Sequence, residues 1–233
     1  MCALNSKTIT YRELVKTLDL ALLKPRMTET DIIAGCERAR SYHLASVSVK
    51  PCYLKLAVGE LAGSDVVVGT VVGFPLGNNT PAIKVAEARE AVANGAVELD
   101  MVMNIGELRS GHTQYVQDEI QSVVEAAEGK AIVKVILENV YLTGEQIVQA
   151  CKLAEAAGAD FVKTSSGFSP RGATLGDVRL MRASVGPGVQ VKAAGGVKSL
   201  DALLAVIDAG ATRVGASAAI RMLDEFKRRF PNR

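Results

Sequence analysis

The chain of 233 residues contains 48% hydrophobic and 22% charged residues, a balance typical of a globular domain with enough apolar material for one sizeable core. Its 27 Lys and Arg residues against 25 Asp and Glu residues leave a formal net charge of +2, which gives no reason to expect nucleic acid or an anionic membrane as a partner. The longest nearly uninterrupted apolar stretch, Val66–Phe74, is too short to span a bilayer, and the N-terminus contains no apolar signal segment.

Short runs rich in β-branched residues alternate with longer amphipathic segments along the whole chain. The runs predict eight strands, at Leu18–Leu23, Leu44–Val49, Val66–Val72, Val97–Met103, Ala131–Leu137, Asp160–Thr164, Val189–Ala193 and Thr212–Gly215. Helical periodicity lies between them at Pro81–Asn94, Gln114–Glu128, Gly144–Ala157, Leu175–Ser184 and Leu200–Ala209. Strands that are almost entirely apolar are typical of parallel strands covered on both faces. The pattern predicts an α/β fold, a (β/α)8 or TIM barrel that forms a single domain over residues 1–233.

Two further features bear on this fold. Leu14 and Leu18 give Thr8–Thr17 the pattern of an N-terminal helix that caps the barrel floor. Gly95, Gly158 and Gly210 follow helical segments and predict left-handed residues at the helix ends. The alternative fold is a doubly wound open sheet, although no G-x-G-x-x-G motif follows the first run.

Charged residues interrupt the apolar runs, and an isolated buried charge costs several kcal/mol unless it is paired or functional. Lys134, Lys163 and Lys192 are separated from one another by 29 residues, one strand–helix repeat, and are expected to point into the barrel in register. Asp100 and Asp19 also lie within apolar runs. Mutual repulsion and burial lower the pKa of lysine, and the resulting free amine can form a Schiff base with a carbonyl compound.

Lys163 is the best candidate for this nucleophile because it lies near the carboxyl end of its strand and the polar loop 164–167 follows directly. Glu98 precedes Asp100 by two positions and so points to the same side, and a role at the surface or as a partner lower in the barrel is favoured over catalysis. The alternative without a catalytic role is that each lysine extends outward between helices.

Glycines follow the last three predicted strands. They are Gly167, the pair Gly195 and Gly196, and Gly215, which with Ser217 opens a helix. Barrels that bind phosphorylated substrates use the loops after the seventh and eighth strands together with a helix N-terminus. These positions therefore predict a phosphate site, although a pair of glycines by itself can simply mark a tight turn.

Cysteine and histidine are too sparse and scattered for most metal sites. The cysteines are Cys2, Cys36, Cys52 and Cys151, with no C-x-x-C pair. Their spacing argues against a disulfide scaffold or a zinc ribbon and indicates a reducing compartment. Two histidines, His43 and His112, cannot supply a three-histidine site. We therefore expect a cytoplasmic protein that uses no metal and no cofactor.

Several motifs, spread over residues 18–223, resemble those of the deoxyribose-phosphate aldolases. They are L-D-x-x-L-L-K-P (18–25), V-V-G-F-P-L-G (71–77), E-L-D-M-V-M-N-I-G (98–106), V-K-V-I-L-E (133–138), F-V-K-T-S-S-G-F (161–168), V-K-A-A-G-G-V (191–197) and R-V-G-A-S (213–217). The resemblance implies a class I aldolase that reversibly cleaves 2-deoxy-D-ribose 5-phosphate to acetaldehyde and D-glyceraldehyde 3-phosphate.

Carried over position by position, the resemblance implies that Lys163 forms the Schiff base, that Lys192 lowers its pKa and that Asp100 transfers protons with Lys192. Asp19 and Lys134 would belong to the surrounding charge network. The phosphate would be held by Gly167, Gly195, Gly196, Gly215 and Ser217. Small phosphosugars and aldehydes would be the only partners besides further copies of the chain, in a dimer or a tetramer.

The sequence departs from the family pattern at a few positions near the implied site. Ala21 stands where the family commonly has threonine, and Ser48 replaces a thiol in the barrel lining. Ala194 replaces a serine before the glycine pair, and Ala218 follows Ser217 where a second hydroxyl or a glycine is common. None of these departures changes Lys163, Lys192 or Asp100.

Two other functions fit a phosphosugar barrel. An isomerase that works by acid–base chemistry would use carboxylates or histidine at the strand ends and would not need aligned lysines. A binding protein without catalysis would keep the glycine loops but would not need Lys163 beside Lys192. The spacing of the lysines argues against both alternatives.

Overall fold

The computed structural model describes residues 4–233, in which strands and helices alternate. The strands are β1 (Leu18–Leu22), β2 (Ser46–Val49), β3 (Val67–Val72), β4 (Glu98–Val102), β5 (Ile132–Ile136), β6 (Phe161–Lys163), β7 (Gln190–Ala194) and β8 (Arg213–Gly215). The α-helices are α1 (Tyr11–Val15), α2 (Glu29–Tyr42), α3 (Leu54–Glu60), α4 (Pro81–Ala93), α5 (Ile105–Arg109), α6 (Thr113–Ala126), α7 (Gly144–Ala156), α8 (Leu175–Ser184), α9 (Leu200–Asp208) and α10 (Ala219–Arg229). Two short 3-10 helices, η1 (Pro51–Tyr53) and η2 (Asn139–Tyr141), follow β2 and β5. Residues 1–3 lie outside the described part of the chain. They include Cys2 and the beginning of the N-terminus, which was expected to contain no signal segment.

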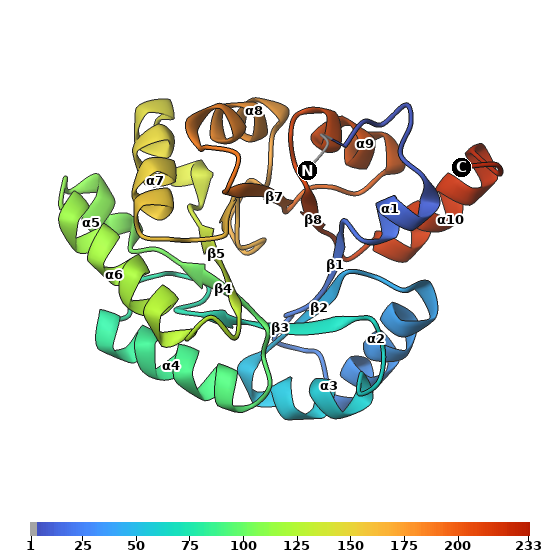
Figure 1. Cartoon of the computed structure of the whole chain (residues 1–233), viewed down its shortest axis with the longest axis horizontal. Coiled ribbons are helices and arrows are strands. Elements are labelled where there is room, and N and C mark those ends of the chain that lie inside the picture. Colours follow the sequence, from blue (N-terminus) through green and yellow to red (C-terminus); the bar gives the residue numbers. More distant parts are fainter. Residues whose placement is uncertain (1–3) are drawn as a thin grey trace.

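The strands form a closed parallel barrel in which each strand pairs with the next one along the chain. The pairs Leu18↔Val214 and Asp19↔Gly215 join β8 to β1 and close the ring. Figure 1 shows the strands in order around the centre, with the helices outside them. The predicted (β/α)8 barrel is confirmed, and the open-sheet alternative is wrong. Because all strands run the same way, their carboxyl ends open on one end of the barrel.

The outward-facing side chains of the strands explain why charged residues can face inward. Leu99, between Glu98 and Asp100, is fully buried, as are Val162 and Val191 on β6 and β7. Successive strand residues point to opposite faces, so these apolar side chains pack between the sheet and the helices. Each contributes roughly 1.5–3 kcal/mol of hydrophobic stabilisation. The barrel therefore has a large apolar layer outside the sheet and does not depend on an apolar interior.

The helix boundaries follow from local capping. Thr10, Thr28 and Thr143 each accept a hydrogen bond from the backbone three residues later, and that residue's side chain bonds back to the threonine N–H. Gly158 and Gly210 follow α7 and α9 with φ of +83° and +110°, which confirms left-handed helix ends. The five helical ranges expected from periodicity agree with α4, α6, α7, α8 and α9 to within two residues.

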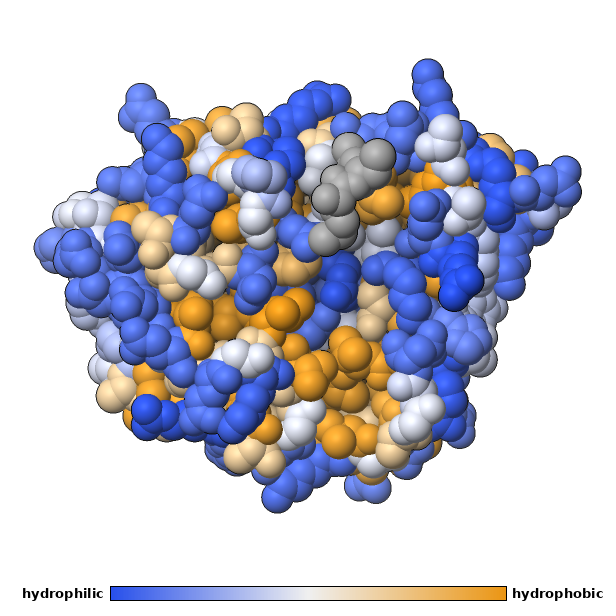
Figure 2. All heavy atoms as spheres, viewed as in Figure 1, coloured by the Kyte–Doolittle hydropathy of each residue, from blue (hydrophilic) through white to orange (hydrophobic). Residues whose placement is uncertain are grey.

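The N-terminal helix is shorter than the segment Thr8–Thr17 from which it was expected. It forms α1, which lies beside α10 in Figure 1. The carbonyl of Val15 accepts a hydrogen bond from the Ala45 N–H just before β2, so the end of α1 adjoins the barrel floor. On the face shown in Figure 2, apolar surface gathers around the centre and polar residues dominate the margin. Within residues 4–233, no helix has both the length and the apolar character needed to cross a bilayer.

Candidate active site

Lys163 and Lys192 lie side by side on neighbouring strands. Lys163 is the last residue of β6, and its Cα pairs directly with that of Lys192 on β7. The expectation that Lys134 shares their height is wrong, because Lys134 pairs with Phe161, two residues before Lys163. Neighbouring strands of a closed barrel are staggered, so equal spacing along the chain does not give equal height. Lys134 instead pairs with Asp100 on β4.

Asp100 is the centre of the buried polar interior. Its Oδ2 accepts hydrogen bonds from Lys163 Nζ at 2.6 Å and from Lys192 Nζ at 2.7 Å, and its Oδ1 accepts one from Lys134 Nζ at 3.0 Å. All four side chains are at most 4% exposed. The structure therefore brings the three lysines together around one carboxylate, although they come from three different strands.

A second layer of charges lies next to this carboxylate. Asp19 Oδ2 is 2.6 Å from Lys192 Nζ, and Glu98 Oε2 accepts a hydrogen bond from Lys134 Nζ at 2.5 Å. Arg213 joins the two carboxylates, with Nη2 at 2.6 Å from Glu98 Oε1 and Nη1 bonded to Asp19 Oδ1. Glu98 is buried and takes the lower-barrel of its two expected roles, not the surface one. Sequence reasoning missed Arg213. The missed signal was its position two residues before Gly215, inside the last apolar run.

The charges of this cluster do not balance when every group is ionised. We call the seven side chains the buried charge network: Asp19, Glu98, Asp100, Lys134, Lys163, Lys192 and Arg213. Four cations face three carboxylates, so the network carries one surplus positive charge. Within the described part of the chain, Lys163 has one carboxylate partner, whereas each of the other cations has two or more. Lys163 is therefore the cation whose charge is least compensated.

This imbalance acts on the protonation of Lys163. Burial lowers the pKa of Lys163 to about 8, and the positive charges of Lys192 and Lys134 act in the same direction, against the attraction of Asp100. Burial alone would raise the pKa of Asp100, but the three ammonium groups outweigh it and hold that pKa well below its ordinary range. About a tenth of Lys163 is then neutral at pH 7, beside a carboxylate that stays ionised.

Lys134, Arg213 and Asp19 remain charged at neutral pH. Burial disfavours the ammonium form of Lys134, but Asp100, Asp19 and Glu98 together raise its pKa above the ordinary value. Asp19 and Glu98 likewise overcome burial and raise the pKa of Arg213. Burial acts to raise the pKa of Asp19, but its cationic neighbours lower it. These groups form a fixed charged base beneath the reactive amine.

The loops after β6 and β7 pack closely on each other. Gly167, Gly195 and Gly196 have φ of +86°, +76° and +80°, a backbone region that favours glycine. A Cβ on Gly172 would lie 2.2 Å from the carbonyl carbon and oxygen of Gly195, so the two loop backbones touch. The predicted loop glycines therefore gather at the carboxyl ends of β6 and β7, next to the lysine pair.

Gly215 lies at the end of β8, beside the network. A Cβ on this residue would be 3.4 Å from Lys192 Cε and 3.3 Å from the Ala194 Cβ. Ser217 is exposed in the turn that precedes α10, and the observed N-cap of that helix is Ala218. The β8 loop thus presents a small residue and a hydroxyl at the same end of the barrel as the other glycines.

Ala21 and Ser48, two positions where the sequence departs from the family pattern, are Cα partners on β1 and β2. Ala21 lies two residues after Asp19 on β1, so its side chain points to the same face of the strand, toward the barrel interior. Ser48 pairs with Ala21 and faces the interior as well. The Ser48 hydroxyl is buried and has no hydrogen-bond partner among the described residues. Both departures are therefore in the wall of the barrel.

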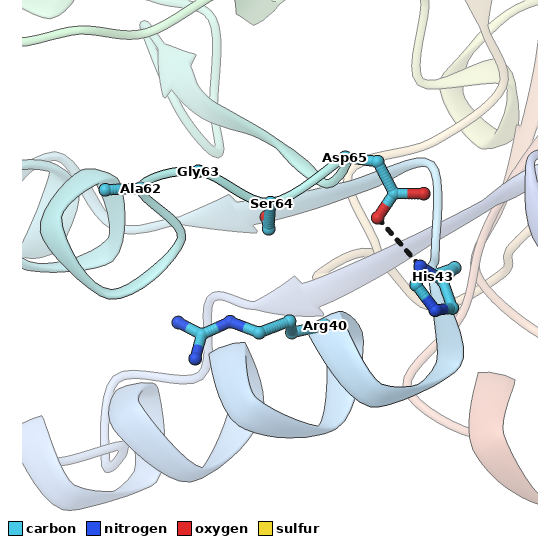
Figure 3. Close-up of a pocket in the computed structure, with 6 residues that line it drawn as sticks. All are labelled: Arg40, His43, Ala62, Gly63, Ser64 and Asp65. Atoms are coloured by element: carbon cyan, nitrogen blue, oxygen red, sulfur yellow. Dashed lines mark hydrogen bonds and ion pairs between the residues drawn. The ribbon is translucent and has the colours of Figure 1, made fainter.

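A separate hollow of about 440 Å³ lies at the opposite end of the fold, between the end of α2 and the turn before β3 (Figure 3). It is lined by Arg40, His43, Ala62, Gly63, Ser64 and Asp65. His43 Nδ1 lies 2.9 Å from Asp65 Oδ1, and both side chains are at least half exposed. This shallow surface site shares no residue with the buried charge network. Over residues 4–233, no group of three or more His, Cys, Asp or Glu side chains is arranged to hold a metal ion.

Fold and site together define a class of protein: a (β/α)8 barrel whose carboxyl end contains a buried lysine of lowered pKa next to a carboxylate and glycine-rich loops. Comparison with known proteins gives the family. The model of the DeoC/LacD family aldolases matches residues 14–228. The chain belongs to this family of aldolases.

Relatives of known sequence and structure agree with this assignment. The deoxyribose-phosphate aldolase of Enterococcus faecalis is 52% identical over 91% of this chain and 96% of its own length. A crystal structure described as a putative deoxyribose-phosphate aldolase from Coccidioides immitis superposes with a TM-score of 0.91 at 38% identity, covering 94% of this chain and 87% of that one. The deoxyribose phosphate aldolase of Aeropyrum pernix, described as a tetramer, has a TM-score of 0.87 at 32% identity and covers 94% of this chain and 92% of that one.

Proposed function

We propose that the protein reversibly cleaves 2-deoxy-D-ribose 5-phosphate into acetaldehyde and D-glyceraldehyde 3-phosphate through a Schiff base on Lys163. The single observation that carries the mechanism is the lowered pKa of Lys163, about 8, at 2.6 Å from Asp100. The name and the 52% identity of the Enterococcus faecalis relative support the choice of substrate.

The reaction begins with attack of the neutral Lys163 amine on the C1 aldehyde of the open-chain sugar. Loss of water gives an iminium ion, which withdraws electrons from the adjacent carbon. Removal of the proton on the C3 hydroxyl then breaks the C2–C3 bond, and the bonding pair moves into an enamine. D-Glyceraldehyde 3-phosphate leaves, C2 of the enamine takes up a proton, and hydrolysis of the new iminium releases acetaldehyde and restores Lys163.

Asp100 and Lys192 supply the proton transfers in this proposal. Both Lys163 and Lys192 bond to the same oxygen of Asp100, so a proton has a short route among the three groups. Lys192 has the additional effect of lowering the pKa of Lys163 by charge repulsion. Asp19 and Lys134 keep Lys192 and Asp100 in place through their ion pairs.

The phosphate would bind in the loops after the last three strands. Gly167, Gly195, Gly196 and Gly215 allow a close approach of backbone N–H groups to an anion, and Ser217 adds a hydroxyl at the start of α10. This arrangement would fix the sugar with its C1 carbon toward Lys163. The reaction as proposed requires no metal and no cofactor, because the iminium takes the place of a Lewis acid.

The protein is proposed to act in the cytoplasm as a homo-oligomer, without nucleic acid or membrane as a partner. The tetrameric description of the Aeropyrum pernix relative supports assembly, and the small net charge of +2 supports the absence of a nucleic-acid partner. Size-exclusion chromatography with light scattering decides whether the chain is a dimer, a tetramer or neither.

Trapping of the covalent intermediate tests the proposed function. The protein is incubated with acetaldehyde and borohydride, digested and mapped by mass spectrometry, and a stable two-carbon adduct is expected on Lys163. Lys163→Arg keeps the positive charge but should give neither adduct nor cleavage. Lys84 is a matched control within the parent protein, since it is fully buried in a pair with Glu119 and should remain unmodified. No adduct anywhere would refute the Schiff base and favour the isomerase or the binding protein.

A further inference from the structure

Glu138, just beyond β5, has an unusual backbone conformation for its residue type. Its φ of 54° and ψ of 61° lie in the left-handed region, which a residue with a side chain rarely adopts. It is 2% exposed, so the conformation is held within the fold rather than at a free surface. Such a conformation persists only when surrounding contacts determine it, and it is found at sites that position other groups.

The Glu138 carboxylate reaches across to the loop that follows β6. Its Oε2 and Oε1 accept hydrogen bonds from the backbone N–H of Ser166 at 3.1 and 3.3 Å, and Oε1 accepts one from Ser169 Oγ at 2.7 Å. The Ser166 hydroxyl in turn accepts a hydrogen bond from the Phe168 N–H at 3.1 Å. Gly167 therefore lies in a short segment that is anchored on both sides.

Lys163 itself is held by other contacts. The N–H of Leu137 bonds to the Lys163 carbonyl at 2.9 Å, and the N–H of Asn139 bonds to the Thr164 carbonyl at 3.0 Å. These are backbone bonds that extend the pairing of β5 with β6, and they do not involve the Glu138 side chain. Loss of the carboxylate would therefore release the loop from Ser166 onward and leave Lys163 in place.

The same loop contacts the second predicted phosphate loop. Beyond Ser169 the chain reaches Gly172, which packs on Gly195, and the Ala173 N–H bonds to the carbonyls of Ala194 and Gly195 at 3.1 and 3.0 Å. Glu138 holds one end of this loop and Gly195 holds the other. A change at Glu138 would thus disturb the relative position of Gly167 and Gly195.

We propose that Glu138 is a positioning residue for the phosphate of the substrate: through Ser166 and Ser169 its buried carboxylate fixes the loop that contains Gly167 against the loop of Gly195. This inference rests on the proposed function. It assigns to Glu138 an effect on the binding of the phosphorylated end of the substrate, with no part in Schiff-base formation at Lys163.

Substrates with and without phosphate separate these effects. The parent protein is compared with Glu138→Ala, which loses all the bonds, and with Glu138→Gln, whose single amide oxygen retains part of them. Asp160→Asn is the control. Asp160 lies just before β6, and its Oδ2 accepts a hydrogen bond from the backbone N–H of Val133 on β5 at 2.8 Å, at the end of the barrel opposite to Glu138. The KM and kcat are measured with 2-deoxyribose 5-phosphate and with 2-deoxyribose, and binding of inorganic phosphate is measured by calorimetry.

Glu138→Ala is expected to raise the KM for the phosphorylated sugar and the Kd for inorganic phosphate by about tenfold, with kcat nearly unchanged. The kcat/KM of Glu138→Ala for 2-deoxyribose should stay at the parent value. The KM of Glu138→Gln for the phosphorylated sugar should lie between the values of the parent and of Glu138→Ala, and the KM of Asp160→Asn should equal that of the parent. Equal losses with both sugars, or no change with either, would overturn the proposal. If Glu138→Ala does not fold by circular dichroism, Glu138→Gln and Ser169→Ala decide the same comparison. Borohydride trapping at Lys163 in the parent distinguishes a failure of this inference from a failure of the proposed function.

Discussion

Replacement of Lys192 by leucine removes one positive charge from beside Lys163 and leaves a side chain of similar size. In the parent protein, the Cα atoms of the two lysines are strand partners and both ammonium groups bond to Asp100 Oδ2. Without Lys192, Asp100 attracts the Lys163 ammonium group with less opposition. The pKa of Lys163 should therefore rise from about 8 toward the ordinary lysine value.

The contacts give the size of this change. Nitrogen atoms at 2.6 and 2.7 Å from one oxygen are no more than about 5 Å apart, where two unit charges repel by about 3 kcal/mol at an effective dielectric constant of about 20. That energy corresponds to about two pKa units, so the neutral fraction of Lys163 at pH 7 falls from about a tenth to about a thousandth. We expect a loss of about two orders of magnitude in kcat from this cause alone.

The assay is the pH dependence of borohydride trapping at Lys163 with acetaldehyde. Only the neutral amine reacts, so trapping rises with pH through the pKa, and the midpoint in Lys192→Leu should lie about two pH units above that of the parent. Lys192→Arg keeps the charge but cannot give up its proton, so its midpoint should stay near the parent value while turnover falls. Superimposable profiles for Lys192→Leu and the parent would show that the two lysines are not electrostatically coupled.

Three further outcomes follow from the site. Ser48→Cys should shorten the half-life of activity in high concentrations of acetaldehyde, because a thiolate in the barrel wall adds to aldehydes and a hydroxyl does not; equal half-lives would place the weak point elsewhere. Dialysis against a chelator should leave the cleavage rate unchanged, and a loss that zinc restores would contradict the lysine mechanism. Arg213→Met should lower the free energy of unfolding by about 3–5 kcal/mol in urea denaturation, because it leaves Asp19 and Glu98 buried with one cation fewer; a change below about 1 kcal/mol would refute the structural role of Arg213.

The fold could be predicted because its signal is local. Each strand is short, apolar and bounded by turn residues, and the alternation with helices specifies a parallel barrel through general rules of connection. The membership of Lys163, Lys192 and Asp100 in one site could also be predicted, since all three interrupt buried runs. The height of Lys134 could not, because the stagger between β5 and β6 depends on pairing across the ring and not on spacing along the chain.

Side-chain partners that lie far apart along the chain could not be predicted from the sequence either. Lys84 on α4 resembles a solvated helix residue, yet it is fully buried and bonds to Glu119 Oε1 at 2.7 Å and to the carbonyls of Gly77 and Val102 at 2.7 and 2.8 Å. Glu119 lies 35 residues away on α6. Helical periodicity gives the side of a helix on which a residue lies, but it does not name the residue that a neighbouring helix places opposite. The partners of Glu138 after β5 and of Arg213 on β8 also lie far away along the chain, and the positions of these two residues in the sequence do not name them.

The surplus positive charge of the buried charge network has a consequence for the whole reaction coordinate. Once Lys163 is neutral, three cations face three carboxylates and the interior is balanced. On the proposed path, the iminium restores the excess and the enamine removes it again. The surroundings that lower the pKa of the Lys163 amine therefore also make the iminium a strong electron acceptor, and they favour the uncharged enamine that remains when the carbon–carbon bond breaks.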